Sequence, residues 1–513
     1  MEGAALRLTW SGTRPYRSHT NHLEEPTDER AVVEGVEVST DHLVGGQRLA
    51  SSDRFADVSP IDEQIIAQVA RGDADTVDLA VAAADGAAEA WGRTPPKERA
   101  AVLHRIADGV EARVEELSVV ETRDNGSLLR SHRRSVMPRV ARNFRFFADK
   151  LLELEREGET SFNGNRERFS WDPSGVTAVI GPWNAPLMLA TWRIAPALAA
   201  GNAVVHKPPE WAPLSASLLG DIALDAGLVP GAYNVVQGIG EEAGAALVAH
   251  PGVTRIAFTG SVETGRLVAA AAAANLTPAS LELGGKSPFL IFADADPSAA
   301  LDQAVGQFDN AGQVCLAGTR LLIESSIYDA FLERFAEATG HVVQGDPRDE
   351  ATDIGPLISR EHFERVDGFV RAGHAEGSKA LVGGGPNDDL GGLYYRPTLF
   401  VDVPRGSALL TREVFGPVLT AQPFRDEAEA IALANETEYG LAATVYTGDE
   451  ARARRVGEQL VAGTVWVNCF FVRDLDAPFG GSRNSGIGRE GGQWSFDFYA
   501  DVKNVVTAPS SGG

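Results

Sequence analysis

The sequence contains little cysteine and no long hydrophobic run. Only Cys315 and Cys469 occur among 513 residues, which is too few for a disulfide framework in a chain of this size. No apolar stretch approaches the roughly 20 residues that cross a bilayer, and residues 1–30 are polar. These absences argue against a disulfide-stapled or membrane-spanning protein and predict a cytoplasmic location.

Positive charge is also scarce relative to negative charge. The 46 Lys and Arg residues face 71 Asp and Glu residues, so the formal net charge is −25 at pH 7. Such a chain repels phosphate over most of its surface, which argues against nucleic acid or an anionic membrane as a partner. Any anionic ligand must therefore be held by locally placed cations.

The length and the 44% content of apolar residues predict several domains with a large core. Residues 1–30 lack hydrophobic periodicity and are interpreted as a loose N-terminal arm. Two short strand-like runs flank Gly45-Gly46, which predicts a hairpin. Helical spacing follows between Val77 and Trp91, and a second amphipathic run covers Arg99 to Val120.

From about Gly175 onward, apolar strands alternate with helices, and this alternation predicts a parallel sheet covered by helices. A second α/β stretch begins at Ser287 and ends near Pro478. The last segment, DVKNVVTA, has the alternation of an edge strand. Because no low-complexity linker separates these regions, we expect interleaved domains.

Three polar side chains in unusual settings are candidates for catalysis. Cys315 lies among small and polar residues in DNAGQVCLAG, where a thiol can serve as a nucleophile, whereas Cys469 in WVNCFF fits a core strand better. Glu282 ends a strand between two leucines, and burial there raises a carboxyl pKa towards that of a general base. Asn184 in GPWNAP can donate to an oxyanion. Each of these residues alone also fits a structural role.

Two strand ends are candidates for nucleotide binding. IAFTGSVETG combines a strand, a turn of small residues and a helix start, so Gly260 and Ser261 lie where free amides suit phosphate. VHKPPEW places Lys207 and Glu210 after another strand, and an acidic group there accepts the hydroxyls of an adenosine ribose. Taken individually, either charged residue is better explained as a surface charge.

Together and in this order, the motifs resemble the aldehyde dehydrogenase superfamily. The resemblance runs from about residue 40 to 508 and rests on GPWN, KPPE, FTGS, ELGGK, GQVC, EVFGP, and PFGG followed by SGIGRE. It implies an α/β fold with a Rossmann-like cofactor domain, an α/β catalytic domain and a small β oligomerisation extension. The boundaries we expect are residues 31–152 and 174–284 for the cofactor domain, 285–484 for the catalytic domain, and 153–173 with 485–513 for the extension.

The resemblance also implies the reaction. Cys315 resembles the family nucleophile that forms a thiohemiacetal and then a thioester, Asn184 resembles the oxyanion donor, and Glu282 resembles the base that activates water. Family members that transfer the acyl group to coenzyme A tend to lack this base, so release of a free acid is expected. No metal ligands are assigned. The residues that match the family's cofactor contacts are Lys207, Glu210, Gly260, Ser261, Glu413, Trp183 and Phe415.

Retention of Glu210 favours NAD over NADP, because a carboxylate repels a 2′-phosphate. Pro209 departs from the family, which more often has Ser or Ala there, and it removes one N–H near the ribose. The only other partners expected are a small-molecule aldehyde and copies of the same chain, in a homodimer or homotetramer.

Two arginines suggest the class of aldehyde. Arg139 and Arg473 match positions that face the substrate tunnel in the superfamily, although a chain so rich in arginine also offers surface positions. The FVRDL segment and the tail resemble the branch that oxidises hydroxymuconic-type semialdehydes, including carboxymethyl and amino variants. This indicates a carboxylated semialdehyde; the alternatives are a general or betaine aldehyde dehydrogenase and a catalytically silent relative.

Overall fold

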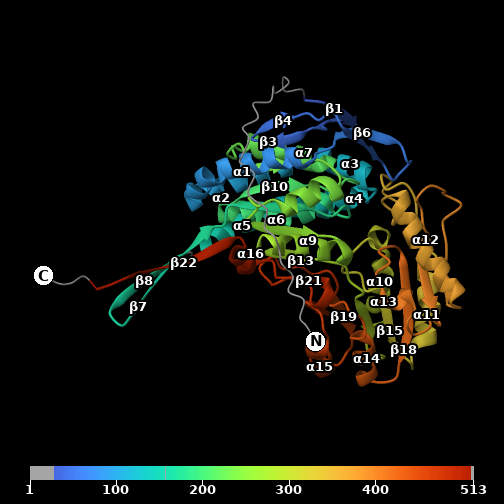
Figure 1. Cartoon of the computed structure of the whole chain (residues 1–513). Coiled ribbons are helices and arrows are strands. Elements are labelled where there is room, and N and C mark those ends of the chain that lie inside the picture. Colours follow the sequence, from blue (N-terminus) through green and yellow to red (C-terminus); the bar gives the residue numbers. More distant parts are fainter. Residues whose placement is uncertain (1–27, 156, 510–513) are drawn as a thin grey trace, which may run out of the picture.

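The computed structural model describes residues 28–155 and 157–509, so most of the predicted N-terminal arm lies outside the described residues. The first strand of the described part of the chain is β1 (Arg30–Val33). Two large sheets form the body, and a long β-ribbon projects from it (Figure 1). No helix among the described residues has the length and apolarity required to cross a membrane.

The first sheet has eight strands and a parallel centre. Its order is β21-β13-β12-β9-β10-β11-β3-β4, in which the neighbours from β13 to β11 run parallel and β21, β3 and β4 pair antiparallel. The predicted hairpin at Gly45-Gly46 joins β3 to β4, and both glycines have the positive φ that a tight turn requires. The strands are β9 (Val176–Ile180), β10 (Ala203–Lys207), β11 (Tyr233–Val235), β12 (Arg255–Thr259), β13 (Ala279–Glu282), β21 (Gly486–Ile487), β3 (His42–Val44) and β4 (Gln47–Leu49).

Helices cover both faces of this sheet. On one face lie α1 (Ala74–Arg93), α8 (Ala245–Ala249) and α9 (Val262–Ala274); on the other lie α6 (Pro186–Ala200) and α7 (Leu214–Asp225), with α2 (Pro96–Ala112), α3 (Val114–Asn125) and α5 (Met137–Glu153) packed behind them. The amphipathic run predicted from Arg99 to Val120 is helical, but it divides at Arg113 into α2 and α3.

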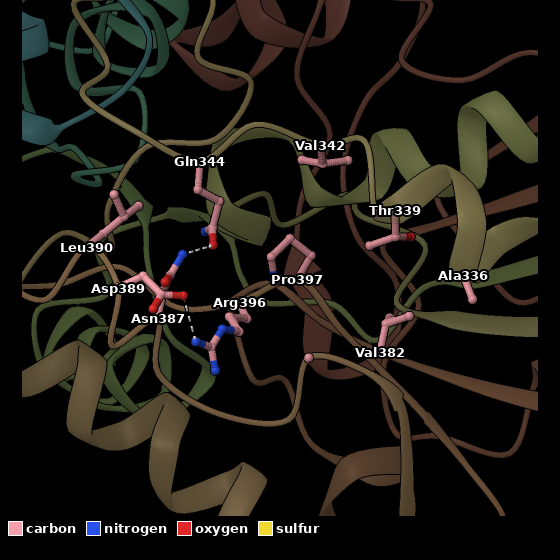
Figure 2. Close-up of a pocket in the computed structure, with 12 residues that line it drawn as sticks. Ala336, Thr339, Val342, Gln344, Val382, Asn387, Asp389, Leu390, Arg396 and Pro397 are labelled. Carbon is pink, nitrogen blue, oxygen red and sulfur yellow. Dashed lines mark hydrogen bonds and ion pairs between the residues drawn. The ribbon is translucent and has the colours of Figure 1, made fainter.

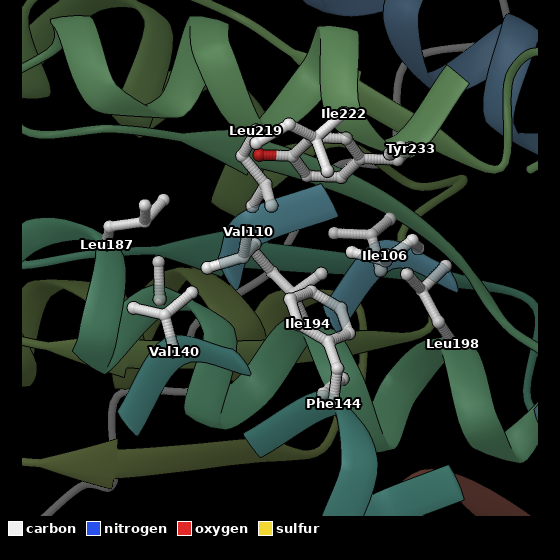
Figure 3. Close-up of a cluster of buried hydrophobic side chains, with 14 of the residues drawn as sticks. Ile106, Val110, Val140, Phe144, Leu187, Ile194, Leu198, Leu219, Ile222 and Tyr233 are labelled. Carbon is white, nitrogen blue, oxygen red and sulfur yellow. The ribbon is translucent and has the colours of Figure 1, made fainter. Parts of the chain in front are cut away.

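A buried apolar cluster joins α2, α5, α6 and α7 (Figure 3). Ile106, Phe144 and Ile194 point towards one another there, and each is at most 1% exposed. Helix α6 starts with proline at its first turn and stops at Gly201, whose φ of 100° caps the helix. These signals fix where α6 begins, directly after the GPWN segment that leaves β9.

The second sheet has seven strands in the order β16-β17-β18-β15-β14-β19-β20, parallel except for β16. Helices α10 (Pro297–Val305), α11 (Tyr328–Thr339) and α12 (Arg360–Ala375) cover one face, and α14 (Glu427–Ala434) and α15 (Glu450–Gln459) cover the other. The strands are β14 (Pro288–Ile291), β15 (Arg320–Glu324), β16 (Lys379–Val382), β17 (Thr398–Val401), β18 (Val418–Phe424), β19 (Ala442–Tyr446) and β20 (Thr464–Val467).

The projecting ribbon consists of β7 (Glu157–Phe162), β8 (Asn165–Pro173) and β22 (Ala500–Thr507), which pair antiparallel (Figure 1). Residues 485–499, which the sequence analysis grouped with this extension, lie elsewhere. They contribute β21 to the first sheet and helix α16 (Gly492–Phe498), which packs on α6. The chain therefore returns to the first sheet before it enters the ribbon.

Candidate active site

A cavity of about 440 Å³ contains the candidate catalytic residues. Its lining comes from α5, α6, the end of β13, the loop before β15 and the segment between β20 and β21. Cys315, Glu282 and Asn184 all contribute to the lining, and so do both predicted substrate residues, Arg139 and Arg473. Residues far apart in sequence thus converge on one enclosed space.

Cys315 follows a backbone turn in which Asn310, Ala311 and Gly312 all have positive φ. The thiol is half-buried at the cavity wall. Burial raises its pKa to about 12, and the nearby carboxyl groups of Glu413 and Glu282 add to the shift. The resting group is therefore a neutral thiol, and its use as a nucleophile requires a proton acceptor.

Glu282 is the last residue of β13, paired in register with Thr259, and its side chain is 5% exposed. Its Oε1 is buried without a hydrogen-bond partner among the described residues. Burial raises the pKa of this carboxyl above the ordinary 4.5, and the neighbouring Glu490 raises it further. A carboxyl group with a raised pKa can exchange protons near neutral pH.

Asn184 lies in the loop between β9 and α6. Its Nδ2 donates to the main-chain oxygen of Gln313, two residues before Cys315, at 2.9 Å. A carboxamide nitrogen carries two hydrogens, so this contact orients the group and leaves the second N–H for another acceptor. The loop that carries Asn184 is thereby tied directly to the loop that carries the thiol.

The two predicted substrate arginines share one aromatic neighbour. The guanidinium carbon of Arg139 lies 5.5 Å from the centre of the Trp192 ring, and that of Arg473 lies 5.3 Å from it and 3.6 Å from the centre of Phe479. Burial lowers the pKa of Arg139 to about 10, and the charge of Arg473 contributes. Within residues 28–155 and 157–509, neither arginine forms a salt bridge with a carboxylate.

Asn143 orients Arg139 from one helical turn away. Its Oδ1 accepts from Nε of Arg139 at 2.9 Å, and its Nδ2 donates to Met188 and Thr191 of α6, at 3.1 Å each. Because these acceptors fix the amide, Arg139 is held with its terminal nitrogens free for a ligand.

The candidate cofactor residues cluster at the carboxyl ends of the first sheet's strands. Lys207, at the end of β10, donates to Glu210 at 2.6 Å. Burial alone would raise the pKa of Glu210, but Lys207 and backbone amides hold it below its usual value. Ser261 caps α9 by accepting from the Thr264 amide at 3.0 Å, directly after Gly260. These positions lie after the carboxyl ends of β10 and β12, where open α/β sheets bind ligands.

The remaining three cofactor candidates lie where the EVFGP and GPWN segments meet. The ring centres of Trp183 and Phe415 are 5.2 Å apart, edge to face. Glu413 accepts from the Gly285 amide at 2.9 Å, and a side chain at Gly284 would collide with its carboxylate. Burial raises the pKa of Glu413 to about 7. A polar ligand reaching Glu413 would thus lie close to the loop that follows Glu282.

A second hollow, at the outer edge of the second sheet, is not lined by candidate catalytic or cofactor residues (Figure 2). It lies between α11 and β16, where Asn387 donates to Gln344 at 2.9 Å and Arg396 pairs with Asp389 at 3.2 Å. Its lining contains no cysteine, histidine or glutamate. The cavity at Cys315 is therefore the candidate active site.

Three residues of the site, Arg193, Glu490 and Trp192, were not predicted from the sequence. Arg193 and Glu490 form a buried ion pair at 3.0 Å beside Glu282. The ring of Trp192 contacts the guanidinium groups of Arg139 and Arg473. The sequence offered one signal for Arg193: it is the single charged residue in the apolar segment PLMLATWRIAPALAA. Cys469 was expected in a core strand, but it follows the end of β20 and is half-buried.

Comparison with known proteins agrees with this geometry. The profile of the aldehyde dehydrogenase family matches residues 48–505. The chain belongs to the aldehyde dehydrogenase family. It is an oxidoreductase that acts on aldehydes, and the resemblance drawn from the motifs and the predicted fold class are both confirmed.

Three relatives illustrate the match. The 2-hydroxymuconic semialdehyde dehydrogenase of Pseudomonas sp. (strain CF600) is 43% identical, over 90% of this chain and 98% of the relative. The 2-aminomuconic semialdehyde dehydrogenase of Danio rerio is 41% identical, over 91% and 97%. The crystal structure of betaine aldehyde dehydrogenase from Staphylococcus aureus in complex with NAD+ superposes with a TM-score of 0.90 at 34% identity, covering 93% and 96%.

Proposed function

We propose that this aldehyde dehydrogenase oxidises a carboxylated semialdehyde, of the 2-hydroxymuconic or carboxymethyl-hydroxymuconic type, to the acid with NAD. The observation that carries the proposal is the shared cavity, in which Cys315, Glu282 and Asn184 meet two arginines that form no salt bridge with a carboxylate of the described residues. The names of the relatives from Pseudomonas and Danio rerio support this substrate class.

The first step is addition of the Cys315 sulfur to the aldehyde carbon. The thiol proton passes to solvent water, the S–C bond forms, and the carbonyl π electrons move to oxygen to give a thiohemiacetal oxyanion. The free N–H of Asn184 and the main-chain N–H of Cys315 donate to this oxyanion. Fixed donors aimed at developing charge are worth most in a site that excludes water.

A bound NAD supplies the hydride acceptor that converts this adduct into a thioester. Glu413 and Phe415 would hold the nicotinamide end with Trp183, while Lys207 and Glu210 would bind the adenosine ribose. Gly260 and Ser261 would meet the pyrophosphate at the start of α9. The fit to NAD is supported by the Glu210 carboxylate, which is charged at neutral pH and repels a 2′-phosphate.

Hydrolysis of the thioester completes the cycle. Glu282 takes a proton from water, the hydroxide adds to the acyl carbon, and the C–S bond breaks as the Cys315 thiolate leaves with the electron pair. The unpartnered Oε1 of Glu282 is free to accept that proton. The product is a free carboxylic acid.

Arg139 and Arg473 give the substrate preference. One hydrogen bond to a charged group is worth about 1.5–3 kcal/mol, so two arginine contacts supply roughly 3–6 kcal/mol. At about 1.4 kcal/mol per tenfold, that separates carboxylated from neutral aldehydes by roughly two to four decades. The same charges repel cationic aldehydes such as betaine aldehyde.

The test compares kcat/KM for 2-hydroxymuconic semialdehyde with kcat/KM for a neutral aldehyde of similar length. We expect Arg473→Ala to reduce the ratio by at least tenfold. Arg134→Ala is the control, because Arg134 is 72% exposed and does not line the cavity. An unchanged ratio in Arg473→Ala would show that this arginine does not bind the carboxylate.

We also propose that the ribbon mediates assembly into a homodimer or homotetramer. Strand β22 exposes Val502, Val505 and Val506 by more than half of their surface, and exposed apolar strands of this kind favour pairing with another chain. Sedimentation of Val505→Lys, compared with the unaltered protein, should show dissociation; an unchanged mass would contradict the role of the ribbon.

A further inference from the structure

Three residues around the thiol form a closed ring of hydrogen bonds. Nδ2 of Asn184 donates to the main-chain oxygen of Gln313 at 2.9 Å. The amide N and Nε2 of Gln313 both donate to the main-chain oxygen of Asn310, at 3.1 and 3.0 Å. Nδ2 of Asn310 then donates back to the main-chain oxygen of Asn184 at 3.2 Å. The ring thus links the loop after β9 to the loop that carries Cys315.

The ring is anchored at two points outside the loops. The hydroxyl of Ser127 donates to Oδ1 of Asn310 at 2.8 Å, and the amide of Ile358 donates to Oε1 of Gln313 at 2.9 Å. Because each amide oxygen meets a donor and each amide nitrogen meets an acceptor, the orientations of both side chains are determined. Gln313 is 1% exposed, so water does not compete for its contacts.

The ring encloses a backbone conformation that needs support. Asn310 and Ala311 have φ values of 50° and 55°, and Gly312 follows with 69°. A side chain at Gly312 would lie 2.1 Å from the main-chain oxygen of Gly416. Left-handed residues in succession cost free energy, so contacts from the surroundings must hold this turn.

We infer that Asn310 and Gln313 are positioning residues, which aim the free N–H of Asn184 and the Cys315 thiol at the same carbonyl group. The inference rests on the proposed roles of Cys315 and Asn184. Asn310 acts through the Asn184 main chain, and Gln313 acts through the Asn184 side chain. Opening the ring would let the oxyanion donor and the nucleophile move independently while the binding contacts of aldehyde and cofactor stay in place.

The test is the rate of the first burst of reduced cofactor at saturating semialdehyde and NAD. Asn310→Gly keeps the left-handed backbone and removes the amide, so we expect the burst rate to fall about tenfold or more, within the roughly 10²–10³-fold that losing one oxyanion donor costs. The KM values of both substrates should change less than about threefold. Asn163→Gly is the matched control, since Asn163 is also left-handed but lies in the turn between β7 and β8.

A double-mutant cycle with Asn184→Ala separates this inference from the proposed function. If Asn310 acts through Asn184, Asn310→Gly should change the burst rate less than about twofold in the Asn184→Ala background. A full tenfold loss in that background would overturn the positioning role. A normal burst in Asn184→Ala alone would refute the oxyanion role, and the inference with it.

A second variant covers failure of the first to fold. Asn310→Asp preserves the side-chain size but turns a donor into an acceptor that faces the Asn184 main-chain oxygen. We expect a loss at least as large as in Asn310→Gly, with an unchanged melting temperature for the cofactor-bound enzyme. A burst at the unaltered rate in a folded Asn310→Asp variant would also overturn the inference.

Discussion

The two faces of α5 and α6 show how one pair of helices serves both folding and chemistry. One face carries Phe144 and Ile194 into an apolar cluster where each is at most 1% exposed (Figure 3). The opposite face carries Arg139 to the cavity, and Trp192 belongs both to the cluster and to the cavity lining. Five residues along α5 and two residues along α6 separate a side chain in the apolar cluster from one that lines the cavity.

The difference lies in whether the polar groups are neutralised. The core face has apolar side chains with close contacts, and nothing there awaits a partner. The cavity face holds two arginines whose guanidinium groups lie against Trp192 and Phe479, and in the described part of the chain neither forms a salt bridge with a carboxylate. A buried cation without a paired carboxylate is costly, and an anionic ligand in the cavity reduces that cost. These surroundings therefore favour binding of an anionic ligand.

The largest expected effect is on stability, from truncating a side chain in the apolar cluster. Phe144→Ala removes a buried ring, so we expect the free energy of unfolding to fall by about 3–5 kcal/mol, measured by denaturant titration. The value of kcat per folded molecule should change little, because Phe144 does not line the cavity. A loss of kcat larger than about tenfold in the folded variant would show that the two faces are not independent.

A substitution on the cavity face should instead change substrate specificity and leave stability nearly unaltered. Arg139→Met removes a charge that burial already disfavours, so the free energy of unfolding should stay within about 1 kcal/mol or rise. We expect kcat/KM for the carboxylated semialdehyde to fall about 10- to 100-fold, since one charged contact is lost. Equal losses for a neutral aldehyde would instead indicate damage to the site as a whole.

The smallest expected effect concerns pH. Burial and then Glu490 raise the pKa of Glu282, and a general base works only when it is ionised. Thioester hydrolysis should therefore slow as the pH falls, beginning above the range of an ordinary carboxyl group. Glu490→Gln removes a negative neighbour, so the acidic limb of the kcat profile should move to lower pH.

Arg489→Gln provides the opposite control. Arg489 lowers the pKa of Glu282, so its removal should move the same limb to higher pH. Stopped-flow separation of the burst from the steady state assigns the limb to hydrolysis. A limb that stays in place in both variants would show that Glu282 is not the titrating base.

Much of this arrangement could be predicted from the sequence because the signals were local. The strand-helix alternation predicted the parallel sheet, and the glycines at 45 and 46 predicted the hairpin that joins β3 to β4. Cys315, Glu282 and Asn184 each stood in a setting that suggested chemistry, and the structure places all three at one cavity.

The residues that were missed depend on contacts between distant segments. Arg193 and Glu490 are separated by almost 300 positions, and neither sequence neighbourhood reveals that they pair. The break between α2 and α3 at Arg113 interrupts a run that remains amphipathic on both sides. Residues 485–499 resembled a tail in the sequence. Their β21 strand instead pairs with β13 at the edge of the first sheet, a contact between distant segments that the local sequence does not reveal.

The most direct test of the central claim is to trap the covalent intermediate in Glu282→Gln. With 2-hydroxymuconic semialdehyde and NAD, we predict one equivalent of reduced cofactor per site in a rapid burst, followed by very slow turnover. Mass spectrometry of the quenched protein should then find the acyl group on Cys315. Steady turnover at the unaltered rate, or an adduct on Cys469 instead, would contradict the account.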